Sequence, residues 1–163
     1  MLCVNDAILN MTGSGAGALL AAAVFSLDPR WVSRRRDFLE GFRGEKYLAV
    51  PCETFPPCGG ISGAVYLQRS HARGLSDDPE AVCTGGHSGY GALGIAYTKR
   101  ARRVFLIGYD LNPVRGRKDL YRFWADNYWN ALPQLQARGV EVFNCNRGSA
   151  IDAFPYADPD SVN

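Results

Sequence analysis

Short apolar runs alternate with longer stretches of helical periodicity through most of the 163-residue chain. The short runs are bounded by Gly, Pro, Asn or Asp, which is typical of strands. They are Leu2–Val4, Ala23–Leu27, Lys46–Val50, Ala64–Leu67, Arg103–Tyr109 and Val140–Phe143. The uninterrupted run Val104–Ile107 predicts a central strand that is buried on both faces.

Three longer stretches have the apolar spacing of helices. They run from Pro29 to Gly44, over Ser88–Lys99 and over Asp119–Arg138. Ser88 is the predicted N-cap of the second helix. Pro133 predicts a kink or break in the third, because proline lacks the N–H of a helical hydrogen bond. We expect the polar stretch His71–Val82 to be a mobile surface loop.

Strands alternating with helices of this length predict the fold class. It is α/β, with a Rossmann-like, mainly parallel sheet flanked by helices on both faces. The length favours a single domain over residues 1–163, with 158–163 as a frayed tail.

Composition narrows the class of protein. The hydrophobic content of 47% and the charged content of 21% are those of an ordinary globular domain. The formal net charge of +2 is too small to indicate nucleic-acid binding by itself. Basic residues cluster locally, and the simplest interpretation of each cluster is a solvated helix face or helix end. The clusters are Arg34–Arg36, Lys99–Arg103 and Arg115–Lys118.

Five cysteines without a CxxC pair favour reduced thiols over a disulfide framework or a zinc site, and hence a cytoplasmic protein. No apolar run reaches the length of a membrane span, so we expect no membrane partner. Ala16–Phe25 is apolar enough for a signal-peptide core but has no positive charge before it, so a buried segment is the better interpretation.

The most informative motif is the glycine-rich turn Gly85-Gly86-His87-Ser88-Gly89, which opens a helix. Glycines let a backbone approach a ligand closely, and the free N–H groups of a helix N-terminus favour phosphate or carboxylate. The alternative is that the glycines serve close packing alone. The turn matches neither a P-loop nor a nucleophile elbow.

His87 is the candidate catalytic residue. A histidine at a helix N-terminus is pushed towards its neutral form, which can accept a proton or donate one hydrogen bond. The other histidine, His71, lies in the predicted surface loop.

Polar residues follow several predicted strands, and ligands of open parallel sheets bind beyond the carboxyl ends of strands. The alternative is that Asx residues merely cap helices and turns there. Asp110 could contact a ribose hydroxyl or a divalent cation, but a lone carboxylate predicts no metal site. The candidate ligand-binding residues are Asn5, Asp6, Asp28, Gly85, Gly86, Ser88, Gly89, Tyr109 and Asp110, with Asn144–Ser149 at the same predicted edge.

Two stretches, Thr84–Tyr97 and Arg103–Leu111, resemble a family of uncharacterised phage and prophage proteins with a Rossmann-like fold. More distantly, the chain is similar to single-domain bacterial sialyltransferases. Val4–Ala7, Leu27–Trp31, Gly139–Cys145 and Gly148–Pro155 add to the likeness to the phage family, which spans most of the chain.

The resemblance to the transferases implies a crevice for a cytidine nucleotide sugar, with Asn5, Asp28, Ser88 and Asp110 near the donor. The transferases carry a histidine base downstream of the strand matching Val104–Tyr109, whereas Asn112–Lys118 contains no histidine.

A second departure concerns the start of the chain. Relatives usually have an extra strand and a glycine-rich turn before the segment matching Met1–Asp6. Without that strand a sheet edge stays open, which a second subunit of a homo-oligomer would close.

Two functions follow. The first is a nucleotide- or nucleotide-sugar-binding protein, glycosyltransferase-like if it is an enzyme, holding a small anionic ligand with Ser88 and the amides of residues 86–89. The second is a non-catalytic phage accessory protein that binds protein or nucleic acid. The basic loop Arg115–Lys118 and the aromatic-rich stretch Tyr121–Trp129 suggest the second function.

Overall fold

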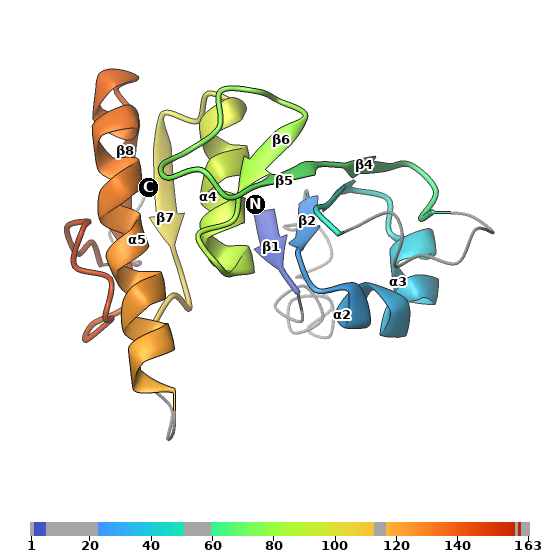
Figure 1. The fold of residues 1–163 in the computed structure, drawn as a ribbon, viewed down its shortest axis with the longest axis horizontal. Coiled ribbons are helices and arrows are strands. Elements are labelled where there is room, and N and C mark those ends of the chain that lie inside the picture. The colour runs from blue at the N-terminus through green and yellow to red at the C-terminus, as the bar shows by residue number, and fades with distance from the viewer. Residues whose placement is uncertain (1, 6–22, 51–59, 113–116, 159, 161–163) are drawn as a thin grey trace.

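The computed structural model describes residues 2–5, 23–50, 60–112, 117–158 and 160, and confirms the predicted fold class (Figure 1). Its largest sheet is parallel, with four strands in the order β1-β2-β3-β4. These strands are β1 (Leu2–Val4), β2 (Ala23–Ser26), β3 (Glu45–Leu48) and β4 (Ala64–Tyr66).

Two further pairs of strands are also parallel. They are β5 (Gln68–Ser70) with β6 (Ala81–Cys83), and β7 (Arg103–Leu106) with β8 (Glu141–Asn144). The described helices are α2 (Pro29–Arg34), α3 (Arg36–Gly41), α4 (Ser88–Thr98) and α5 (Lys118–Ala137). In Figure 1, α5 lies at the left of the molecule, and α2 and α3 lie at the opposite end.

The four-stranded sheet is covered on both faces, as its strands alternate apolar side chains between two core clusters. Val24 of β2 packs in one cluster with Trp31 of α2 and Leu39 of α3. The next residue, Phe25, packs in another with Ile95 of α4. Successive side chains of a strand point to opposite faces, so these two clusters place α2 and α3 on one face and α4 on the other.

A third cluster joins α4 and α5 to the β7–β8 pair. Tyr90 of α4, Tyr128 of α5 and Val142 of β8 are among its buried members. Helix α5 also holds the segment between β5 and β6, because the Gln134 side chain accepts from the Leu75 N–H at 2.6 Å and donates to the Leu75 carbonyl at 2.9 Å. One side chain therefore satisfies both backbone groups of a loop residue.

The prediction of a surface loop over His71–Val82 is wrong at its C-terminal end, where Ala81 and Val82 belong to β6. Val82 is only 2% exposed and packs under α4. The strand has only three residues and follows Pro79 and Glu80, so it is too short to give a recognisable apolar run.

The predicted helix after Pro29 is two helices, since Arg35 lies between α2 and α3. In contrast, α5 continues through Pro133, so the prediction that this proline breaks the helix is wrong. Leu132 and Leu135 on either side of it pack in or against the third cluster, and this burial stabilises the helix.

The expectation that Val104–Ile107 is buried on both faces is also wrong. β7 ends at Leu106, and Ile107 is 64% exposed. Leu106 is buried in the third cluster, whereas Phe105 is half-buried and stacks on Phe143 of β8 with ring centroids 5.4 Å apart. Only one face of this strand pair therefore contributes to the described core. Among the described helices, none is long and apolar enough to cross a membrane.

Candidate functional site

The carboxyl end of β2 meets the first turn of α4, and the segment that leads from β6 into α4 bonds to the end of β5. The Leu27 N–H donates to the Ser88 hydroxyl at 3.2 Å, and the Thr84 N–H after β6 donates to the Ser70 carbonyl at 3.4 Å. Ser88 was predicted as the N-cap, but His87 holds that position in an extended conformation and makes no capping bond with its side chain. Ser88 instead ties the helix to the end of β2.

Glycine is required at 85 and 86 by both backbone conformation and packing. Their φ angles are +51° and +92°, in the region that side chains disfavour. A Cβ on Gly85 would lie 2.5 Å from the Tyr90 ring, and one on Gly86 would lie 2.5 Å from Nε1 of Trp124. Of the two interpretations of the turn, close packing accounts for these glycines.

Gly89 is equally enclosed, because a Cβ there would lie 2.8 Å from Tyr109 and 3.0 Å from His87. The Tyr109 hydroxyl donates to the Gly89 carbonyl at 3.2 Å, which joins the segment after β7 to the start of α4. Burial raises the pKa of the Tyr109 phenol, so it stays protonated and remains a donor. Three of the predicted site residues, His87, Gly89 and Tyr109, are therefore brought together.

His87 lies between two aromatic side chains of α5. Its ring centroid is 5.4 Å from that of Trp124 and 5.7 Å from that of Tyr128. Burial lowers the pKa of His87 to about 4, so the imidazole is neutral at pH 7. Its Nε2 is buried and has no hydrogen-bond partner among the described residues.

Two more buried polar atoms near this edge have no partner in the described part of the chain: the Tyr128 hydroxyl and Asn5 Oδ1. Tyr128 is 0% exposed, and its burial raises the pKa of the phenol well above the usual value. Asn5 continues the β1–β2 ladder with its N–H, which donates to the Phe25 carbonyl at 3.2 Å. Buried polar atoms in native proteins usually have partners, so each of these needs an explanation.

Arg69 of β5 supplies a cation that the sequence analysis missed. Its guanidinium donates to the backbone carbonyls of Leu27 and Ala49, at the ends of β2 and β3. Burial lowers the pKa of Arg69, and the nearby charge of Asp28 opposes that effect. Because Leu27 bonds Arg69 through its carbonyl and Ser88 through its N–H, the cation lies close to the start of α4. A single basic residue two positions after the apolar run Ala64–Leu67 was the available signal.

The predicted acidic residues have different roles. Asp28 is the N-cap of α2, where Oδ1 accepts from the N–H groups of Arg30 at 2.8 Å and Trp31 at 3.2 Å. This contact supports the capping interpretation for that residue. Asp110 is exposed, and its carbonyl accepts from the Ala150 N–H at 2.8 Å. Asp6 lies outside the described residues.

A cavity of about 420 Å³, largely open to solvent, lies at the carboxyl end of β8. It is lined by residues 144, 146–149 and 151 and by Phe154 and Tyr156. The Ser149 hydroxyl donates to the Tyr109 carbonyl at 2.6 Å, so Tyr109 links the loop that lines this cavity to the start of α4.

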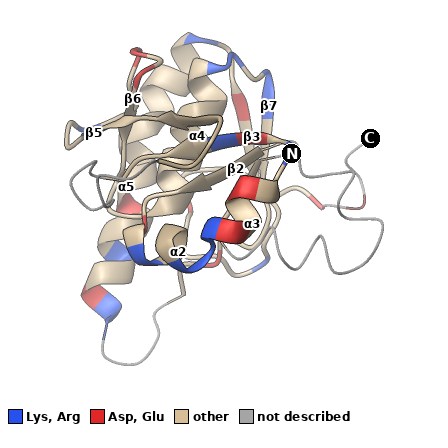
Figure 2. Ribbon diagram, turned by 90° about the vertical axis from the view of Figure 1, so that its right-hand side faces the viewer, with Lys and Arg blue, Asp and Glu red and all other residues tan. Residues whose placement is uncertain are grey.

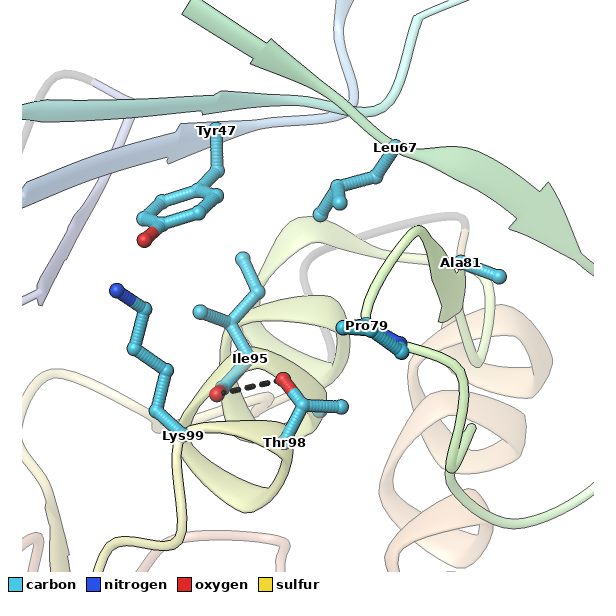
Figure 3. A pocket seen from close by; sticks show the side chains of 8 residues that line it. Tyr47, Leu67, Pro79, Ala81, Ile95, Thr98 and Lys99 are labelled. Carbon is cyan, nitrogen blue, oxygen red and sulfur yellow. Dashed lines mark hydrogen bonds between the residues drawn. The ribbon is translucent and has the colours of Figure 1, made fainter.

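A second cavity, of about 300 Å³, lies at the other end of α4 (Figure 3). Its lining is mostly apolar, and the Lys99 ammonium points towards the Tyr47 ring, 5.1 Å from the centroid. Lys99 is already paired with Glu45, at 2.7 Å. Neither cavity includes a residue of the glycine turn 85–89.

The described residues hold no group of three or more His, Cys, Asp or Glu side chains arranged to bind a metal ion. Cys3, Cys83 and Cys145 are buried thiols. A scan against protein-family models matched none of them, and searches of curated proteins and of solved structures found no match. The function is therefore inferred from the geometry of this chain.

Proposed function

We propose that the chain binds a small anionic ligand, a nucleotide or a nucleotide-sugar, beside the first turn of α4. One observation carries the proposal: His87 Nε2 and the Tyr128 hydroxyl are buried next to this turn without partners among the described residues. Leaving such atoms unpaired costs about 1–3 kcal/mol each. Ligand oxygens or hydroxyls would supply the missing partners.

Electrostatics favour a negative charge at this place. Helix α4 has no side-chain cap at its N-terminus, so no cap neutralises the positive end of its dipole. The N–H groups of Gly86 and His87 already donate to Thr84, which leaves those of the first helical residues for an anion. Arg69 adds a positive charge near Ser88, and it has no ion pair with an acidic residue in the described part of the chain.

Binding requires Trp124 to move, because its indole nitrogen occupies the space beside Gly86. Rearrangement of side chains on binding is common where the backbone stays fixed. Trp124 would therefore report the ligand through its fluorescence, whereas the buried Trp31, packed in a different cluster, would not.

The experiment titrates cytidine, uridine and guanosine nucleotides into the protein while measuring Tm and tryptophan fluorescence. A ligand at about 100 times its Kd stabilises by about 2.7 kcal/mol, which raises Tm by several degrees. We expect both signals in the wild type, and only the Tm signal in Trp124→Phe. His87→Phe keeps an aromatic ring but removes Nε2, and should weaken binding, whereas His71→Gln should not. No response to any of these nucleotides rules out the proposal.

If the protein is an enzyme, we propose glycosyltransferase-like chemistry with His87 as the base. A general base works best when its pKa is near the working pH. With a pKa of about 4, His87 would be fully deprotonated but weakly basic at pH 7. The rate of donor turnover should therefore rise with pH through about 4 and be flat at neutral pH. An unchanged rate in His87→Phe would remove this role.

The second candidate function, binding to protein or nucleic acid, has a specific observation in its favour. Leu120 and Phe123 near the start of α5 are 39% and 56% exposed, next to the basic Lys118 and Arg122. Figure 2 shows Lys and Arg also on α2 and at the turn between α4 and β7, in separate groups and not in one stripe. Arg115, part of the predicted basic loop, lies outside the described residues.

A salt titration separates the two functions. Nucleic-acid binding through these residues should weaken steeply with salt and should be reduced in an Arg117→Ala/Lys118→Ala double variant. Binding that is indifferent to salt and to those substitutions would exclude nucleic acid as the partner of this surface.

A further inference from the structure

The loop after β8 is fixed by a buried asparagine, Asn144, which is 3% exposed. Its Oδ1 accepts from the Asn146 N–H at 3.0 Å, and its Nδ2 donates to the Ile151 carbonyl at 3.1 Å. The two bonds close the loop from within, so the wall of the 420 Å³ cavity that this loop forms is held in place before any ligand arrives. Such preorganisation lowers the entropic cost of binding.

Asn146, which lines this cavity, has an unused donor. Its Oδ1 accepts from the Gly108 N–H at 3.0 Å, which fixes the orientation of the side-chain amide. Its Nδ2 is buried and has no acceptor among the described residues, and Asn146 is one of the residues that line the cavity. A ligand oxygen would satisfy this donor.

Arg147 at the same cavity provides charge. Its guanidinium carbon lies 4.5 Å from the centroid of the Tyr156 ring, and a guanidinium nitrogen lies 3.7 Å from the Asp158 carboxylate. Asp158 compensates part of the positive charge, which reduces the advantage that a phosphate dianion would have over a singly charged anion. The guanidinium still has N–H groups for a planar carboxylate.

Apolar side chains complete the wall. Ile151 and Phe154 line the cavity and are buried, at 3% and 6% exposure, and the Tyr156 ring adds a flat surface. Ligand sites commonly combine a mostly apolar lining with a few polar groups that fix the orientation. This combination suits a ligand with a polar end and an apolar body.

We propose that this cavity binds a small monocarboxylate with an apolar or aromatic body. The carboxylate accepts from Asn146 Nδ2 and pairs with Arg147, and the body of the ligand lies against Phe154 and Tyr156. The proposal does not depend on the one at α4, because no residue that lines this cavity belongs to the glycine turn 85–89.

The test follows ¹⁵N-labelled full-length protein by NMR while benzoate is added, with inorganic phosphate and sodium chloride as comparison salts. A ligand this small should bind with a Kd on the order of 1 mM. We expect saturable shifts in the side-chain amide of Asn146 and in the backbone amides of residues 146–156 with benzoate. Sodium chloride should produce none.

Two variants test the donors. Asn146→Asp keeps the oxygen that accepts from Gly108 but replaces the free donor by a negative oxygen, so benzoate binding should be lost. Arg147→Gln should weaken it roughly tenfold. Gln136→Glu makes the same amide-to-carboxylate change on the exposed end of α5 and should leave binding intact.

The proposal fails if benzoate gives no saturable shift, or if Asn146→Asp binds as the wild type does. It also fails if phosphate shifts the same amides with equal affinity, because the carboxylate and the apolar body would then have no role. A thermal melt of each variant confirms folding, and Arg147→Gln, whose side chain is exposed, keeps the test decisive should Asn146→Asp unfold.

Discussion

The hydroxyl of Ser88 accepts a hydrogen bond of 3.2 Å from the backbone N–H of Leu27, 61 residues earlier in the chain. The contact attaches the first residue of α4 to the carboxyl end of β2. It also orients the helix whose N-terminus we propose as an anion site.

Ser88→Ala should lower the free energy of unfolding by about 1 kcal/mol, because the Leu27 N–H loses its acceptor in a partly buried position. Ser88→Thr retains a hydroxyl and should lose less. Ser33→Ala, on the exposed side of α2, is the matched control and should change stability little. Urea denaturation measures all three, and equal stability of Ser88→Ala and wild type would show that the bond contributes nothing.

The low pKa of His87 predicts a pH dependence of stability. The folded-state pKa of about 4 lies below the ordinary value of 6.5, so the unfolded chain binds a proton more readily between these two values. The contribution of His87 to the free energy of unfolding should be constant above about pH 6.5 and fall as the pH drops towards 4. Below about pH 4 this contribution should be constant again. The total loss is about 3 kcal/mol.

His87→Phe should remove this part of the pH dependence while keeping a ring between Trp124 and Tyr128. His71→Gln, in an exposed loop, is the control and should retain it. Tm measured from pH 4 to pH 8 gives the answer. A wild-type-like slope in His87→Phe would mean that other groups cause it.

Two glycine-to-alanine substitutions in helices should have opposite effects. A Cβ on Gly91 would lie 2.6 Å from the ring of Phe25, which is fully buried in β2, so Gly91→Ala should destabilise by about 1–3 kcal/mol. Gly41 at the end of α3 has no atom within 4 Å of such a Cβ, so Gly41→Ala should be neutral or stabilise by up to about 1 kcal/mol. In chemical denaturation, the midpoint should fall for Gly91→Ala and should stay the same or rise for Gly41→Ala. A midpoint of Gly91→Ala that does not fall would contradict the packing described for α4.

The contact between Gln134 and Leu75 should be among the most costly polar contacts to lose. Gln134→Leu leaves both backbone groups of Leu75, which is 5% exposed, without partners, so we expect a loss of about 2–3 kcal/mol. Gln134→Glu keeps the acceptor for the Leu75 N–H and should lose less at pH 7. Gln136→Leu, two residues further along α5 and exposed, is the control. A loss no greater than that of the control would show that water replaces the side chain without cost.

The fold class could be predicted because strands such as β2 and β3 appear as apolar runs between turn residues, and because α4 and α5 have helical spacing. The strands β5 and β6 could not be predicted, since a strand of three residues beside polar residues gives no periodic pattern. Similarly, the effect of Pro133 on α5 could not be predicted from local propensity, because the packing of α5 against the third cluster keeps the helix continuous through this proline.

The residues near the start of α4 were found because glycines and a histidine form a continuous motif. Contacts between distant segments could not be found this way. Nothing near Ser88 in the sequence indicates Leu27, and nothing near Arg69 indicates the carbonyl of Ala49. The glycines alone suggested a loop open to a ligand. In the structure, Trp124 of α5 packs closely against Gly86 and fills that space with its indole ring.

The bond between Gln134 and Leu75 also bears on how the chain folds during synthesis. Translation proceeds from the N-terminus, so the peptide group of Leu75 is made well before residue 134 and lacks this partner until α5 has left the ribosome. The connection between β5 and β6 therefore gains its contact with α5 only late in synthesis. A nascent chain stopped before α5 would have its first strands but lack the anchor for the connection between β5 and β6.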